Sequence, residues 1–248
     1  MNGIKKAKTV LITGASRGLG QATALAMAER GYHVWIAVRD PEGAASIASQ
    51  IHTDGGAATV IALDVTDPTA IAHVAARIHA QHGHLDALVN NAGIMLDGAW
   101  LGNTVLTVDA QTLQRTFETN FYGAVAVAQA MWPLLCKAGH ANVVNVSSRM
   151  GSNTLHADPE GPMKGAKPFA YDASKAALNT LTTHLAEVGA PDGIQVNSAH
   201  PGWVRTDLGT EQAMLSVQEG VQTIIELATL PAGSRTGRFE YQGSPLPW

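Results

Sequence analysis

The sequence predicts an α/β fold built on a single doubly wound parallel sheet with helices on both of its faces. Short β-branched and apolar runs alternate along the chain with longer segments of helical pattern. A glycine-rich turn joins the first of these strands to the first helix. The 248 residues can bury one large core, and no linker, repeat or low-complexity segment interrupts them, so we expect one domain over residues 1–248.

Composition and charge exclude several classes of protein. Hydrophobic residues make up 46% of the chain and charged residues 15%, which predicts a folded protein. The formal net charge of −4 provides no basic surface for nucleic acid. Cys136 is the single cysteine, which excludes an internal disulfide and fits a reducing compartment. With no signal-like opening segment and no apolar run near the roughly 20 residues that span a bilayer, we expect no membrane association and a cytoplasmic location.

The first strand, Lys8–Ile12, leads through the glycine-rich turn into a helix over Gln21–Arg30 that Gly31 ends. Glycines in such a turn let the backbone approach a pyrophosphate, whose charge lies over the helix N-terminus. The order strand, turn, helix therefore favours nucleotide binding over an ordinary turn. The turn reads Thr13-Gly14-Ala15-Ser16-Arg17-Gly18-Leu19-Gly20.

The second strand, His33–Val38, ends where the cofactor is usually selected. Asp40 stands about 20 residues after the glycine turn, where an acidic residue would hold ribose hydroxyls and select NAD. Asp40 can equally cap the helical run Glu42–Ile51. Arg39 at the strand end and Arg17 in the turn carry two guanidinium groups that suit a 2′-phosphate, so we prefer NADP(H). Two ordinary surface arginines are the alternative.

Polar residues follow the third and fourth strands, Ala58–Leu63 and Leu85–Val89. Asp64 can bond an adenine amino group, and Asn91 can brace the sheet or touch a cofactor; each can also be a plain turn residue. Asp67 and Pro68 start the intervening helix, which runs to roughly Ala80, and the apolar loop Ile94–Val108 can wall a pocket.

A helix capped by Asp109 runs toward Leu135 and places Asn120 among apolar neighbours, where an amide is unfavourable unless it is hydrogen-bonded. The fifth strand, Ala141–Val146, follows and ends at a pair of serines. Residues 152–170 carry three prolines and two glycines, which predicts a long loop.

Tyr171 and Lys175 follow that loop on a predicted helix, four residues apart and therefore on one face. A nearby ammonium favours the phenolate and lowers the phenol pKa from its usual value of about 10 toward the working range. Taken alone, such a pair is more often a packed ring beside a solvated amine.

The remaining chain gives a sixth strand at Ile194–Ser198, a helix over Glu211–Leu230 and a short last strand from Gly237 to Phe239. Because the carboxyl ends of parallel strands share one edge of the sheet, the polar and glycine segments that follow strands should meet there. We therefore interpret as one site the glycine turn, Asp64, Asn91, Ser148 and Pro201-Gly202.

These motifs resemble those of the short-chain dehydrogenases/reductases, and the resemblance covers essentially the whole chain. The shared motifs, in chain order, are Thr13-Gly-x-x-x-Gly-x-Gly20, Asp64, Asn90-Asn91-Ala92-Gly93, Asn120, Ser148, Tyr171-x-x-x-Lys175 and Pro201-Gly202. The segment from Pro201 to Asp207 and the ending Pro-Leu-Pro-Trp are similar to the carbonyl-reductase branch.

The resemblance implies a Rossmann fold and reversible, NADP(H)-dependent reduction of a ketone or aldehyde to an alcohol. It implies that Tyr171 is the general acid/base, that Ser148 orients the carbonyl oxygen, and that Lys175 holds the nicotinamide ribose and lowers the Tyr171 pKa. Asn120 would support a water-linked proton path to Lys175. The cofactor contacts implied are Gly14, Ser16, Arg17, Gly18, Leu19, Gly20, Arg39, Asp64, Val65, Asn91, Ala92, Gly93, Tyr171, Lys175, Pro201, Gly202, Val204 and Thr206.

One departure from the family pattern is the 23 positions between Ser148 and Tyr171, more than in many members. The additional residues, roughly 153–168, lie where they can cover a substrate or obstruct the helix packing of tetrameric relatives. A homo-oligomer, dimer or tetramer, and a monomer are therefore all open. Met95, Trp100, Met150 and Trp203 can line an apolar pocket or belong to the core.

The ten histidines show no zinc-ligand arrangement, so we expect no metal site. Besides the NADP-dependent carbonyl reductase, two functions stay open. One is an NAD-preferring secondary alcohol dehydrogenase, which Asp40 supports. The other is a non-catalytic dinucleotide-binding sensor, against which the complete set Ser148, Tyr171 and Lys175 argues.

Overall fold

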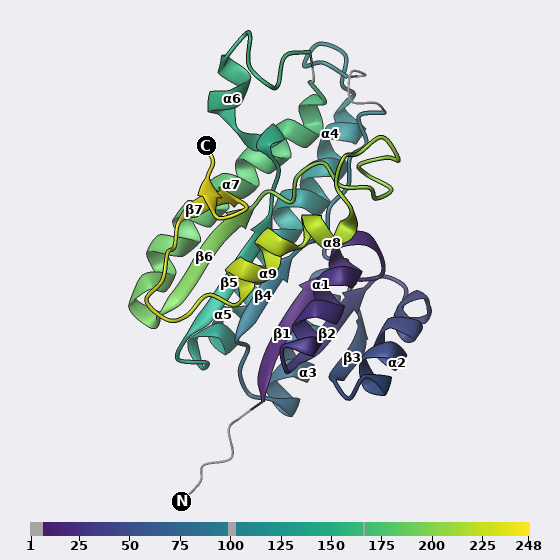
Figure 1. Cartoon of the computed structure of the whole chain (residues 1–248), viewed down its shortest axis with the longest axis vertical. Coiled ribbons are helices and arrows are strands. Elements are labelled where there is room, and N and C mark those ends of the chain that lie inside the picture. The colour runs from purple at the N-terminus through teal and green to yellow at the C-terminus, as the bar shows by residue number, and fades with distance from the viewer. Residues whose placement is uncertain (1–6, 99–102, 166) are drawn as a thin grey trace, which may run out of the picture.

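The fold is an eight-stranded sheet with helices on both faces, as predicted (Figure 1). The computed structural model describes residues 7–98, 103–165 and 167–248. The strand order is β3-β2-β1-β4-β5-β6-β7-β8, and all neighbours pair in parallel except β8, which runs antiparallel to β7. The strands are β1 Lys8–Thr13, β2 Tyr32–Val38, β3 Ala57–Ala62, β4 Ala87–Asn90, β5 Ala141–Val146, β6 Ile194–Ala199, β7 Arg238–Tyr241 and β8 Ser244–Pro245.

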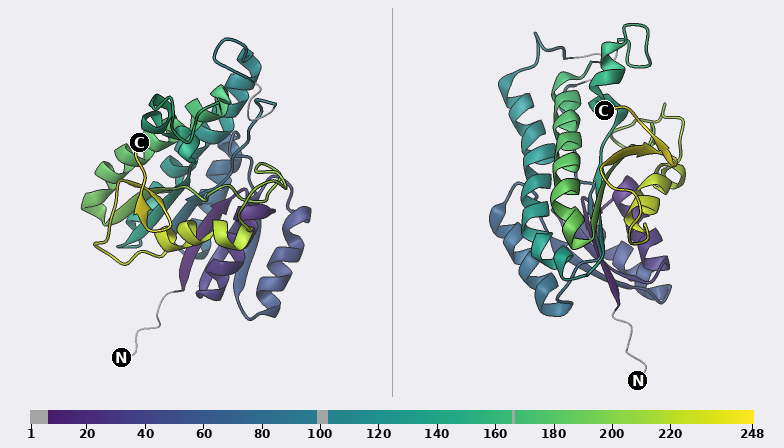
Figure 2. Two further views of the ribbon diagram at one scale, coloured as in Figure 1. Left: turned by 45° about the horizontal axis from the view of Figure 1, so that its top comes forward. Right: turned by 90° about the vertical axis from the view of Figure 1, so that its left-hand side faces the viewer.

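From β1 the chain first adds strands on one side of the sheet, β2 and β3, and then on the other, beginning with β4. In sheets of this kind, ligands bind outside the carboxyl ends of the strands at the point where the order reverses, here between β1 and β4. The nine named helices of the described chain are α1 Gly18–Glu29, α2 Ala45–Thr53, α3 Pro68–Gln81, α4 Ala110–Phe117, α5 Gly123–Cys136, α6 Asn153–Ala157, α7 Phe169–Gly189, α8 Val217–Gly220 and α9 Gln222–Ala228. Seen edge-on, α3, α5 and α7 lie on one face of the sheet, and α1 and α9 on the other (Figure 2).

Alternate residues of each strand feed two separate cores. In β1, Val10 and Ile12 pack with α1 and α9, whereas Leu11 packs on the other face with α3 and α5. Successive side chains of a strand point to opposite faces, so a sheet covered on both faces needs continuous apolar strands. This explains why β1 and β2 are mostly apolar along their length, and why the expected strands were found.

Helix starts follow the predicted caps. The Asp67 carboxylate accepts the Thr69 N–H at 2.8 Å with Pro68 in the first turn, and Asp109 accepts the Thr112 N–H at 2.8 Å. The helix that Asp109 begins continues through α4 and α5 but passes through a π-helical turn at Glu118–Tyr122. That turn places Asn120 in the interior.

Two predicted segments are wrong in part. The helix expected over 211–230 begins only at residue 217, because Leu215 pairs instead with Val204 and its N–H donates to the Trp203 carbonyl at 3.0 Å. The loop expected over 152–170 contains the short helix α6, and α7 already begins at Phe169. The hairpin partner β8 was not anticipated. Of the described helices, none is long and apolar enough to cross a membrane.

Candidate active site

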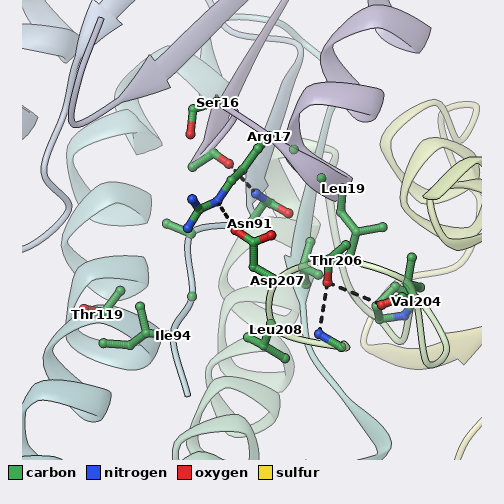
Figure 3. A pocket seen from close by; sticks show the side chains of 18 of the residues that line it. Ser16, Arg17, Leu19, Asn91, Ile94, Thr119, Val204, Thr206, Asp207 and Leu208 are labelled. Atoms are coloured by element: carbon green, nitrogen blue, oxygen red, sulfur yellow. Dashed lines mark hydrogen bonds and ion pairs between the residues drawn. The ribbon is translucent and has the colours of Figure 1, made fainter. Parts of the chain in front are cut away.

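A cleft of about 810 Å³ opens at the carboxyl ends of the strands, beside the point where the strand order reverses (Figure 3). Every predicted site residue except Asn120 lines it. These are Gly14, Ser16, Arg17, Gly18, Leu19, Gly20, Arg39, Asp64, Val65, Asn91, Ala92, Gly93, Ser148, Tyr171, Lys175, Pro201, Gly202, Val204 and Thr206. The sheet edge therefore brings together segments that are far apart in the sequence.

The glycine turn is packed too tightly for side chains. Gly14 has φ +65°, and a Cβ at Gly20 would lie 2.4 Å from the Gly14 carbonyl oxygen. The Asn91 amide donates to the carbonyl oxygens of Thr13 at 2.9 Å and Gly14 at 3.0 Å. Asn91 therefore holds the turn against β4, and it also lines the cleft, so both of the roles open for it stay open.

Two carboxylates at the outer end of the cleft are bound to nearby backbone. Asp64 Oδ1 accepts the Thr66 N–H at 2.9 Å and the Thr66 hydroxyl at 2.8 Å, and these bonds, with a smaller contribution from Arg39, lower the pKa of Asp64. Asp40 accepts the Glu42 N–H at 3.1 Å, so it caps the turn before α2 while also lining the cleft. Asp40 can therefore still act both as a helix cap and as the acidic residue that holds ribose hydroxyls.

Arg17 reaches toward the loop that follows β6. Its Nε lies 3.1 Å from Asp207 Oδ2, and both side chains are exposed (Figure 3). The ion pair joins the glycine turn to the segment of Thr206, whose hydroxyl accepts the Gly209 N–H at 3.2 Å. Asp207 was not among the predicted site residues, and its contact is with Nε of the guanidinium that is expected to meet a phosphate.

Ser148, Tyr171 and Lys175 meet on the floor of the cleft. Ser148 is close enough to the Tyr171 phenol to lower its pKa, and Lys175 Nζ lies 5.6 Å from the centre of the Tyr171 ring. Nζ also donates to the carbonyl oxygen of Val146 at 2.8 Å, which anchors the amine on the end of β5. Ser147 Oγ, by contrast, is buried without a hydrogen-bond partner among the described residues. Both serines line the cleft, so the choice of Ser148 over its neighbour stays a prediction.

The expected direction of the Tyr171 pKa is wrong for this arrangement. Burial raises the pKa of the Tyr171 phenol above its usual value, the bond to Ser148 opposes this, and Asp172 reinforces it. Burial also lowers the pKa of Lys175 to about 8. Desolvation disfavours the charged form of both groups, and here it outweighs the attraction that their spacing suggests.

Asn120 lies behind the cleft and not in its lining. Its amide oxygen accepts the Ile94 N–H at 2.8 Å, and its Nδ2 donates to the Ile94 carbonyl at 2.8 Å and to the Ser174 hydroxyl at 3.0 Å. The predicted need of this buried amide for hydrogen bonds is confirmed. The bonds join the π-helical turn, the segment after β4 and α7, which carries Tyr171.

A buried carboxylate that the sequence did not single out starts the catalytic helix. Asp97 is 1% exposed, and its oxygens accept the N–H groups of Ala170 at 2.9 Å and Tyr171 at 3.1 Å. A helix leaves its first N–H groups without partners inside the helix, and an acidic side chain there satisfies them. Asp97 therefore fixes the first turn of α7 from a segment 73 positions away.

The residues of the cleft fit a nicotinamide dinucleotide. The glycine turn exposes backbone at the N-terminus of the twelve-residue helix α1, where a diphosphate is favoured. Gly93 leaves open the space in front of Lys175, since a Cβ there would lie 3.4 Å from Nζ. No group of three histidine, cysteine or acidic side chains in the described chain could hold a metal ion. Trp100, a candidate for an apolar wall, lies outside the described residues.

The chain was compared with known families and structures. The family described as short chain dehydrogenase matches residues 8–214. A relative named C-signal, from Myxococcus xanthus, is 38% identical over 169 residues, which span 67% of this chain and 94% of that protein. The NADPH-bound carbonyl reductase from chicken fatty liver has a TM-score of 0.85 at 28% identity and covers 98% of this chain and 100% of its own. The carbonyl reductase Sniffer of D. melanogaster has a TM-score of 0.84 at 30% identity with the same coverage. The resemblance drawn from the motifs, carbonyl-reductase branch included, is confirmed.

Proposed function

The chain belongs to the short-chain dehydrogenases, and on that premise we propose that it reduces the carbonyl group of a small ketone or aldehyde with NADPH, reversibly. The observation that carries this proposal is that Ser148, Tyr171 and Lys175 line the same cleft as the glycine turn. A protein that only bound a dinucleotide would need the turn alone.

The nicotinamide, when bound, would supply the hydride. The protein's part is then to hold the carbonyl and to give its oxygen a proton. Ser148 would donate a hydrogen bond to that oxygen, and Tyr171 would donate the proton. The usual phenol pKa of about 10 already lies above neutral pH and burial raises it further, so Tyr171 carries its proton, which is the state that reduction needs.

Lys175 has two roles in the proposal. Its ammonium would hold the ribose of the nicotinamide half and stabilise the phenolate that forms as Tyr171 gives up its proton. The bond from Nζ to the Val146 carbonyl fixes the amine near the ring. Asn120 would position the segment after β4 and start a water-linked path by which the proton is replaced.

We propose NADP(H) over NAD because Arg17 and Arg39 both line the outer end of the cleft. A guanidinium group binds a phosphate with two parallel hydrogen bonds. An NAD-preferring secondary alcohol dehydrogenase is the second candidate, favoured by the single observation that Asp40 lines the cleft beside Arg39.

The proposal is tested by Tyr171→Phe. The variant should lose turnover of ketones by a factor of at least about 100, the size of a general-acid contribution, while NADPH binding measured by fluorescence is kept. Ser148→Ala provides the matched test of the carbonyl partner. Turnover retained by Tyr171→Phe would remove the phenol from the mechanism, and absence of turnover by the wild-type protein with all ketones would refute the proposed function.

A further inference from the structure

The two side chains that would meet the carbonyl oxygen belong to different elements. Ser148 begins the short turn Arg149–Gly151 after β5, whereas Tyr171 lies in the first turn of α7. The additional residues, roughly 153–168, stand between them in the sequence. Both hydroxyls have to point at one oxygen, and a displacement of about 1 Å is enough to spoil such an arrangement. The contacts that hold the turn against the helix start therefore matter for the reaction.

His156, in the short helix α6 of the additional residues, contacts both elements. Its Nε2 lies 2.8 Å from the Met150 carbonyl oxygen and 3.2 Å from Asp172 Oδ2. Met150 stands two residues after Ser148, and its N–H donates to the Ser148 hydroxyl at 3.2 Å. Asp172 directly follows Tyr171. One ring nitrogen thus joins the turn of Ser148 to the helix start of Tyr171.

The second ring nitrogen of His156 determines where its hydrogen lies. Lys167 Nζ is 2.9 Å from His156 Nδ1, and an ammonium can only donate, so Nδ1 accepts and the hydrogen is on Nε2. Burial lowers the pKa of His156 below its usual 6.5 against the bond to Met150, and Lys167 lowers it further, so the ring is neutral near pH 7. Nε2–H therefore donates toward the Met150 carbonyl and Asp172.

Little water can replace this contact. The side chains of His156 and Asp172 are 17% and 12% exposed. Burial, together with the neighbouring Asp97, raises the pKa of Asp172 to about 8, so near neutral pH the two groups form a hydrogen bond and not an ion pair. Removal of the donor leaves buried acceptors without that partner, which is more costly than the loss of an exposed bond.

Helix α6 is itself held in place from outside the additional residues. The Ser152 hydroxyl donates to the Pro247 carbonyl at 2.7 Å, and the Thr154 N–H donates to the Trp248 carbonyl at 2.9 Å. The helix that carries His156 is therefore fastened to the segment after β7, and it presents the ring from a fixed support.

Other contacts join the same turn to α7, but further from the phenol. Asn179 Nδ2 donates to the Gly151 carbonyl at 3.2 Å, and a Cβ at Gly151 would lie 2.6 Å from the backbone of Lys175. These contacts lie one turn or more after Tyr171 along the helix. The contact through His156 acts at the first turn, where the phenol is.

We propose that His156 is a positioning residue for carbonyl reduction, which ties the turn of Ser148 to the first turn of α7 and keeps both hydroxyls aimed at one oxygen. The inference rests on the proposed function and goes beyond it, because it assigns a role to the additional residues. They support the catalytic side chains from behind, a role different from that of a cover over the substrate.

The experiment compares the wild type with His156→Asn, His156→Gln and the control His140→Asn. A glutamine amide nitrogen can take the place of Nε2 and donate, whereas that of asparagine reaches only the place of Nδ1. The control ring bonds the carbonyl oxygens of Gly193 at 3.3 Å and Leu230 at 2.9 Å, but it precedes β5 and so lies at the opposite edge of the sheet from the cleft.

Each protein is assayed with NADPH and butanone, cyclohexanone, acetophenone and benzaldehyde. NADPH affinity is measured by fluorescence titration, and Tm by circular dichroism shows that the variants are folded at the assay temperature. Limited digestion with trypsin, followed by mass spectrometry, measures the rate of cleavage after the exposed Lys164 and so reports on the additional residues without turnover.

His156→Asn should lower kcat about 10-fold or more and leave NADPH affinity unchanged, because the hydroxyls lose their mutual alignment while the dinucleotide site is intact. It should also be cleaved faster after Lys164. His156→Gln should restore kcat to within about threefold of the wild type. His140→Asn should keep the kcat of the wild type, whatever its effect on Tm.

A kcat of His156→Asn within about twofold of the wild type would overturn the positioning role and leave the proposed function standing. An equal loss of kcat in the asparagine and glutamine variants would overturn it as well, since the donor at Nε2 would then not matter. Absence of turnover by the wild type with all four carbonyl compounds would refute the proposed function, and the positioning role with it.

Discussion

Replacement of Asp97 by alanine should weaken the whole catalytic helix from its first turn. The substitution leaves the N–H groups of Ala170 and Tyr171 without their acceptors at a position where Asp97 is 1% exposed. A buried donor that loses its partner costs about 1–3 kcal/mol, and loss of an acidic cap alone typically costs about 1 kcal/mol.

The net loss of unfolding free energy for Asp97→Ala should therefore be about 2–4 kcal/mol. For a chain of this size each kcal/mol lowers Tm by roughly 2–4 °C, so Tm should fall by about 5–15 °C. Thermal unfolding followed by circular dichroism measures this, and Asp97→Asn, which keeps one acceptor oxygen, should fall by about half as much. Turnover should fall as well, since the backbone of Tyr171 loses its anchor.

Asp109→Ala is the matched control. Asp109 caps α4 through the Thr112 N–H in the same way, but it is exposed, so water can replace the carboxylate and the fall in Tm should be clearly smaller. If Asp97→Ala unfolded within about 2 °C of the wild type, or no lower than Asp109→Ala, the argument that a buried acceptor fixes α7 would fail.

Three further predictions follow from other parts of the site. Asp172 has its pKa raised to about 8, first by burial and then by a neighbouring carboxylate, so its contribution to stability is greatest below 3.8 and is lost as pH rises to about 8. The Tm of the wild type relative to Asp172→Asn should fall over that range, and parallel pH profiles of Tm would contradict it. Arg17→Ala and Arg39→Ala should each raise KM for NADPH about 10- to 100-fold more than KM for NADH, because a hydrogen bond between charged groups contributes about 1.5–3 kcal/mol. Equal effects on the KM values of both cofactors would refute the phosphate contacts. Gly151→Ala places a Cβ 2.6 Å from the backbone of α7 and should destabilise the protein by about 1–3 kcal/mol. The control Gly43→Ala, whose Cβ would have its nearest contact at 3.6 Å, should leave the stability unchanged. Similar denaturation midpoints for the two variants would show that α7 moves aside freely.

Site residues whose role depends on backbone conformation or on spacing were predictable. Gly20 must be a glycine because any Cβ meets the Gly14 carbonyl, and Tyr171 and Lys175 share a face because of helix geometry. Both constraints leave a pattern in the sequence itself. The doubly wound topology then carries these local patterns to one edge of the sheet, which is why almost all the predicted positions line a single cleft.

Residues whose role depends on a distant contact were not predictable in this way. Asp97 lies in an apolar loop with no helix start nearby in the sequence, and the helix that it caps begins 72 positions later at Phe169. His156 and Asp207 likewise gain their contacts only when separate segments meet. The start of α8 is a different case, because Ser216 and Glu219 form a capping box that marked the true helix start in the sequence.

The pKa of Tyr171 shows what spacing leaves out. The four-residue interval places Lys175 near the phenol, but it carries no information on how deeply the two groups are buried. Burial penalises phenolate and ammonium alike, so it raises the pKa of the phenol and lowers that of the amine, and it leaves Tyr171 protonated near neutral pH. A protonated phenol beside Ser148 is ready to give a proton to a carbonyl oxygen, whereas oxidation of an alcohol would first require its removal. The same burial that reverses the expected shift therefore keeps the phenol in the form that donates a proton.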